Sequence, residues 1–152
     1  MTNDLVQFVI AALAIVLGAA FEELLPKAMG VGFPVLLAAV PFMAFRRGLT
    51  AGVLFALAAG AMEEAISALP PMTCGSYFVL VALLAHLFRL PLTAAVVGAV
   101  CLQAWLAVWM VGLGGGVFVR ILAAAPVGLV TAVAVGAALS WAWRKAAVDE
   151  CG

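Results

Sequence analysis

The side chains that could do chemistry in this sequence are few, and the most unusual are two pairs of glutamates in apolar surroundings. Glu22 and Glu23 close the first apolar run in GAAFEELLP, and Glu63 and Glu64 interrupt a later run in AGAMEEAISALPP. A carboxylate at the middle of a bilayer costs about 2.5 to 3.5 kcal/mol, and less near the interface. Such groups therefore need a reason to be there.

The two pairs point to different roles. Glu22 and Glu23 stand at the end of their segment, where an interfacial helix end that reaches the headgroups would explain them. Glu63 and Glu64 stand roughly 9 Å inside theirs, at about 1.5 Å per residue, so we expect them to contact a partner or a cavity. The full set of candidate partner or cavity contacts is Glu63, Glu64, Gly60, Ser67, Glu22, Glu23 and Gln103.

The spacing of small residues around the second pair predicts where it points. Gly52, Ala56, Gly60 and Glu64 recur every four residues and share one helix face. Small residues at this spacing let helix backbones approach closely, so we expect Glu64 to face a packed helix interface. Similar stripes, which we interpret mainly as packing surfaces, run through residues 128–140 and 95–107.

No pattern for catalysis, metal binding or cofactor binding is found. His86 stands alone, and Cys74, Cys101 and Cys151 are too widely spaced for a disulfide framework or a metal site. GLGGG lacks the strand and lysine of a phosphate loop. A net charge of zero gives no indication of nucleic-acid binding. We therefore predict a protein that is not an enzyme and has no cofactor. We also expect Cys74 to lie in an outer turn, where a thiol reagent can reach it.

Composition identifies the elements that position these residues. The 152 residues are 68% hydrophobic and 9% charged, with a mean hydropathy of +1.32, whereas a soluble domain is about a quarter charged. We therefore predict an all-α integral membrane protein, and a span needs about 20 apolar residues. The expected single transmembrane domain has about six helices, at 5–25, 33–45, 49–69, 76–88, 92–113 and 121–143, of which the second and fourth are short.

The basic residues predict an orientation, because Lys and Arg are enriched on the cytoplasmic side. On one side of the six segments lie Arg46, Arg47, Arg89, Arg144 and Lys145, and on the other Lys27 and Arg120. Trp141 and Trp143 fit an interfacial anchor on the first side. Both termini are therefore expected in the cytoplasm.

The stretch FPVLLAAVPFMAFRRGLTAGVLFALAAGAMEEAISALPP resembles the rod shape-determining protein MreD family. The matching features are Pro34, the turn RRG at 46–48, Gly52 and Gly60, an acid at Glu63 or Glu64, and SALPP from Ser67. The last helix, from VRILAAAP to SWAWRK, is also similar to that of the family. The chain departs from the family pattern at Val35 and Leu69, and has a Glu pair in place of a single Asp.

The resemblance implies a non-enzymatic component of the bacterial machinery for cell shape and lateral wall elongation, in the inner membrane. Its implied partners are an MreC-like protein, with a RodA-like glycosyltransferase and a penicillin-binding transpeptidase beside it, and membrane lipid. The family's fold is similar to the substrate-binding subunits of energy-coupling-factor transporters. That similarity supplies the alternative, a vitamin-type transporter subunit with Glu63 and Glu64 as ligand contacts.

Overall fold

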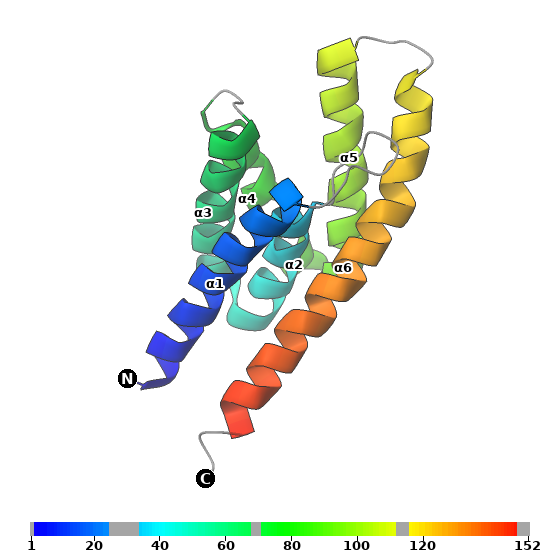
Figure 1. Cartoon of the computed structure of the whole chain (residues 1–152). Helices are drawn as coiled ribbons and strands as arrows, with labels where there is room; N and C mark the ends of the chain where they lie inside the picture. The colour runs from blue at the N-terminus through cyan, green and yellow to red at the C-terminus, as the bar shows by residue number, and fades with distance from the viewer. Residues whose placement is uncertain (1, 25–33, 68–70, 112–115, 149–152) are drawn as a thin grey trace.

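The computed structural model describes residues 2–24, 34–67, 71–111 and 116–148, and within them the regular secondary structure is all helix (Figure 1). The all-α expectation is confirmed for this part of the chain. Its helices are α1 (Thr2–Leu24), α2 (Val35–Arg47), α3 (Leu49–Ser67), α4 (Thr73–Phe88), α5 (Pro91–Val111) and α6 (Gly116–Val148). Each falls on one of the segments expected from hydropathy.

Helix α2 is the centre of the bundle, although it is only 13 residues long. It packs against every other helix, as Figure 1 shows with the remaining five arranged around it. Leu36, Leu37 and Val40 are at most 1% exposed, and buried residues occur all around the helix. A helix that is apolar on all sides is suited to the interior. The short second segment is therefore an interior helix.

Two helix starts differ from the sequence expectation. Helix α2 begins after Pro34, which has no N–H to leave unbonded. Helix α4 begins at Thr73, so residues 73–75, which were expected in the turn before the fourth segment, are helical. The exposed position predicted for Cys74 is wrong, because its side chain is only 1% exposed in the first turn of α4.

The small-residue stripes pack within the chain. A Cβ on Gly52 would lie 2.5 Å from the Cα of Ala44, so α3 and α2 touch through their backbones there. A Cβ on Gly128 would lie 2.9 Å from the Cβ of Ala99, where α6 crosses α5. The ring of Phe42 on α2 fills the equivalent space at Gly136. Glycine is thus required where the central helix and its neighbours approach most closely.

Aromatic and basic side chains gather where α2 and α6 end. The guanidinium of Arg46 lies 5.0 Å from the centre of the Trp143 ring, joining α2 to α6. The ammonium of Lys145 lies 5.1 Å from the centre of the Trp141 ring on the same helix. Cation–π contacts of this kind hold basic side chains beside the aromatic residues of an interface. One end of the bundle is therefore basic and rich in tryptophan.

The outer faces of the helices are apolar. Among the described residues, Leu49–Ile66 and Phe118–Lys145 are long and apolar enough to cross a membrane. Only 28% and 33% of these two windows are buried inside the bundle. The core helix of a soluble protein would be mostly buried, whereas these helices turn Leu54, Leu122 and Val130 outward at 62 to 74% exposure. Lipid is the solvent that suits such a surface.

Candidate functional site

Glu22 bonds to the start of the central helix. The first four N–H groups of a helix have no partner within it, and no side chain caps α2 at Pro34. Glu22 Oε1 accepts a hydrogen bond of 2.7 Å from the backbone N–H of Leu36. A carboxylate at this position also suits the positive end of the helix dipole. The end of α1 therefore supplies the cap that α2 lacks.

Glu22 also contacts the second glutamate pair. Its side chain forms a hydrogen bond with that of Glu63 on α3. A bond between two carboxyl groups requires a proton on one of them, because two carboxylates have only acceptors. The hydrogen bond between Glu22 and Glu63 therefore joins α1 to α3 beside the first turn of α2, where Glu22 also bonds to Leu36. This explains how two acids are tolerated together in apolar surroundings.

Glu64 bonds to the start of another helix. Its Oε2 accepts a hydrogen bond of 2.9 Å from the backbone N–H of Met72, and its Oε1 accepts one of 2.9 Å from the backbone N–H of Gly75. Met72 has a left-handed conformation, with φ of 67°, and no side-chain cap of its own. A non-glycine residue in that conformation costs about 1 to 2 kcal/mol. The two bonds to Glu64 hold this strained turn at the start of α4.

Gly60 is the residue that allows this contact. It lies one turn before Glu64, and a Cβ on Gly60 would lie 2.5 Å from the Cα of Gly75. Helices α3 and α4 therefore cross with their backbones touching at these two glycines. Because the crossing is so close, the Glu64 side chain reaches the free N–H groups of α4. Gly60 belongs to the same site as the glutamates, as a positioning residue.

These three acids form one connected set, which we call the carboxylate network: Glu22, Glu63 and Glu64. It links α1 to α2 and α3, and α3 to α4. The face of Glu64 does meet a packed helix interface, and the helix on the other side is the chain's own α4. The network explains the four-residue spacing of Gly60 and Glu64 without invoking a partner.

The other predicted contacts lie elsewhere. Glu23 is exposed, one position away from Glu22 on α1. Gln103 is half-buried on α5, a helix that packs against α2, α4 and α6 and gives no partner to the bonds of Glu22 and Glu64. The side chain of Ser67, at the last position of α3, lies outside the described residues. Of the predicted residues whose side chains the structure describes, it therefore brings together Glu22, Glu63, Glu64 and Gly60.

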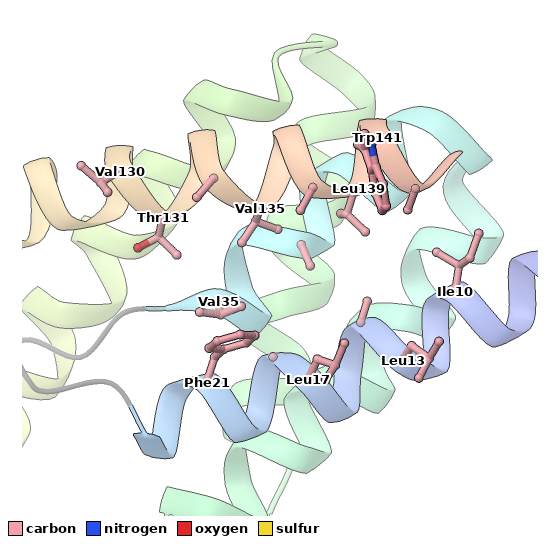
Figure 2. A pocket seen from close by; sticks show the side chains of 16 residues that line it. Ile10, Leu13, Leu17, Phe21, Val35, Val130, Thr131, Val135, Leu139 and Trp141 are labelled. Carbon is pink, nitrogen blue, oxygen red and sulfur yellow. The ribbon is translucent and has the colours of Figure 1, made fainter. Parts of the chain in front are cut away.

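A groove between α1 and α6 was not predicted from the sequence. It has a volume of about 660 Å³ and is floored by α2, and Figure 2 shows Leu13, Leu17 and Phe21 of α1 facing Val135 and Leu139 of α6 across it. The signal that could have revealed it is weak. Its α6 wall contains Ala134 and Ala138, two small residues one turn apart on an exposed face.

The groove has little polar chemistry. The hydroxyl of Thr131 donates a 2.7 Å hydrogen bond to the carbonyl of Val127, one turn back on the same helix. The indole of Trp141 is the other polar group of the lining, at the opposite end. A site for a small polar ligand usually has several convergent polar groups. This groove is suited to hydrocarbon.

Further polar groups of the described residues have structural partners. The hydroxyl of Tyr77, which sequence reasoning did not single out, donates a 2.6 Å hydrogen bond to the carbonyl of Gly98 and ties α4 to α5. His86 Nδ1 lies 3.4 Å from the carbonyl oxygen of Ala44. Within the described part of the chain, no three side chains of His, Cys, Asp or Glu are placed to hold a metal ion.

The two glycines at the α3–α4 crossing give a matched pair of substitutions. We expect Gly60→Ala to destabilise the protein, because the new Cβ would overlap Gly75. Overpacking of this kind costs about 1 to 3 kcal/mol. Gly75→Ala should be neutral or stabilising, since its Cβ would meet only Glu64 Oε1 at 3.7 Å and Leu57 at 3.9 Å. Unfolding by a denaturing detergent measures both, and equal loss in the two variants would contradict the described crossing.

Substitutions at Glu64 should follow the number of bonds that each removes. Glu64→Gln keeps one acceptor, and we expect a loss of about 1 kcal/mol in the free energy of unfolding. Glu64→Leu removes both acceptors and should cost about twice as much. Glu64→Lys should be the most severe change, because it places a positive charge at the positive end of α4.

Glu23 is the control for this series, because it is exposed on a neighbouring helix. Glu23→Gln and Glu23→Leu should leave the unfolding transition in mild detergent unchanged within error. If Glu64→Leu were as mild as Glu23→Leu, the cap at the start of α4 would not be contributing to stability.

Comparison of the chain with protein families, curated proteins and solved structures gives no match. The resemblance to the MreD family therefore rests on the residues quoted from the sequence.

Proposed function

We propose that this protein is a non-enzymatic, multi-pass membrane component of the bacterial machinery for cell shape and lateral wall elongation, and that it acts by binding an MreC-like partner. The observation that supports this proposal most is that the buried acids bond to the chain's own helices inside the bundle, where they serve its structure. Glu22 and Glu64 hold the starts of α2 and α4. The outer surface that remains is apolar and suited to lipid and to other membrane helices.

The arrangement of the helices supports six crossings with both termini on the cytoplasmic side. In Figure 1 the start of α1 and the end of α6 lie at the same end of the bundle. Helices α2, α4 and α6 end in Arg47, Arg89 as the C-cap, and Lys145 within the last turn. Helices that alternate in direction bring these three ends together. Arg120, in the first turns of α6, belongs to the opposite end.

The outer face of α3 is where we expect the partner to bind. Leu54, Ala58, Ala61 and Ala65 are exposed and share one face of the helix, opposite the packed stripe that contains Gly60. In lipid, small residues favour association because they let a second helix approach closely. On the inner side of α3, the carboxylate network joins the end of this helix to α1 and α4. Glu63 and Glu64 thus position the contact from within the bundle.

One observation favours the alternative of a vitamin-type transporter subunit. The groove of about 660 Å³ lies within the usual size of a small-molecule site. Its lining argues the other way, because Thr131 bonds to its own helix and Glu63 and Glu64 do not line the groove. A polar vitamin would find few partners there. The role of a vitamin-type transporter subunit is therefore the second candidate function.

The topology can be tested with introduced cysteines. Met72 and Leu90 flank α4 and are 69% and 56% exposed, whereas Cys74 is buried and should stay unreactive. With Cys101 and Cys151 replaced by Ser, we expect an impermeant maleimide added to intact spheroplasts to label Met72→Cys. Leu90→Cys should react only after permeabilisation. The parent without either new cysteine is the control, and the reverse pattern would contradict cytoplasmic termini.

The partner can be tested by co-purification from mild detergent with a tagged MreC-like protein from the same organism. We expect Ala61→Leu to reduce its retention several-fold, because the larger side chain keeps a second helix from approaching the exposed face of α3. Ala12→Leu is the matched control, an equally exposed alanine on α1 that should leave retention unchanged.

Two outcomes would contradict the proposal. If the MreC-like protein were retained equally by Ala61→Leu and by the unmodified chain, the exposed face of α3 would not be the contact. Retention of a transporter coupling subunit, with no MreC-like protein retained, would replace the wall-elongation role by the transporter alternative.

A further inference from the structure

The groove between α1 and α6 has the length of one membrane leaflet. Its α6 wall runs from Val130 to Ala142, a difference of 12 positions and so about 18 Å at 1.5 Å per residue. Half of the hydrocarbon core of a bilayer is about 15 Å thick. A transmembrane helix of a partner would run along twice that length. An extended acyl chain matches it.

The two ends of the groove differ in charge. At one end Trp141 lines the groove, and the ammonium of Lys145 lies over its ring. Arg144, next to Lys145 in the sequence, is exposed at the same end. At the other end Phe21 lines the groove, and the exposed Glu23 follows it on α1. A ligand with a hydrocarbon chain and an anionic head is complementary to this arrangement in only one direction.

We propose that the groove is a binding site for an anionic phospholipid. One acyl chain lies between α1 and α6 on the floor that α2 provides, and the phosphate is bound by Lys145, whose ammonium lies over the Trp141 ring that lines the groove. The Trp141 ring separates the apolar and charged parts of the site, as aromatic residues do at membrane interfaces. This inference rests on the proposal that the chain crosses the membrane, and it is independent of which protein is the partner.

The first test is the lipid retained by the full chain after purification in mild detergent, identified by mass spectrometry. We expect about one anionic phospholipid for each chain. Ala138→Phe, which places a ring inside the groove, should remove most of it. Ala137→Phe should retain it, because this exposed residue of the same helix does not line the groove. Ala134→Phe is a second groove-filling variant, should Ala138→Phe fail to fold.

The second test measures the preference for the head group. The purified protein is exchanged into vesicles in which phosphatidylglycerol or phosphatidylcholine carries bromine on its acyl chains, and quenching of Trp141 is followed with the other tryptophans replaced by Phe. We expect saturable quenching that favours phosphatidylglycerol. Lys145→Gln should reduce this preference about fivefold, the effect of one basic residue near an anionic head group.

Three results would overturn the proposal. Equal quenching by the two lipids would show that the site does not select an anionic head group. Unchanged lipid retention in both groove-filling variants would show that the lipid binds outside the groove. Release of the MreC-like partner by Ala138→Phe, with lipid retention unchanged, would make the groove a protein interface. Labelling of both Met72→Cys and Leu90→Cys before permeabilisation would instead contradict a membrane crossing by α4, so the two failures can be told apart.

Discussion

The start of a helix inside an apolar bundle needs hydrogen-bond acceptors, and this requirement determines much of the structure. Helix α2 is buried from its first turn and has no capping side chain of its own. Water cannot supply the missing acceptor in the apolar interior of the bundle, and a buried N–H group left without a partner costs about 1 to 3 kcal/mol. Glu22 supplies it through its bond to Leu36. A carboxylate in apolar surroundings is therefore explained by the helix that it completes.

The doubling of the glutamates follows from helix geometry. Successive residues of a helix point about 100° apart, at 3.6 residues per turn. Glu22 can thus turn inward while Glu23 faces outward, and only the first is part of the network. On α3 the same angle lets Glu63 reach α1 while Glu64 reaches α4. One pair of adjacent acids therefore connects a single helix to two neighbours.

Periodicity and composition predicted the helices well, because apolar segments and glycine stripes are local features of the chain. Spacing alone predicted that Gly52, Ala56 and Gly60 form a packed face of α3. It did not predict which helices pack against that face. That Gly60 meets Gly75, and that Glu22 caps α2, depends on how separate helices cross. The exposed turn expected around Cys74 was wrong because Glu64, eight residues before Met72, stabilises a helical start there. Bonds between segments carry no periodic signal.

The carboxylate network and the groove are two results of one arrangement. The bonds of Glu22 draw the end of α1 toward α2 and α3. Gly18 lets α1 cross closely over Leu36, since a Cβ there would lie 2.9 Å from the leucine side chain. Helix α1 is thereby held on the α3 side of the central helix, while α6 is held on the other side by Gly136 and the Arg46–Trp143 contact. The space between α1 and α6 follows from these two attachments, and only an apolar occupant can fill it without leaving polar groups unbonded.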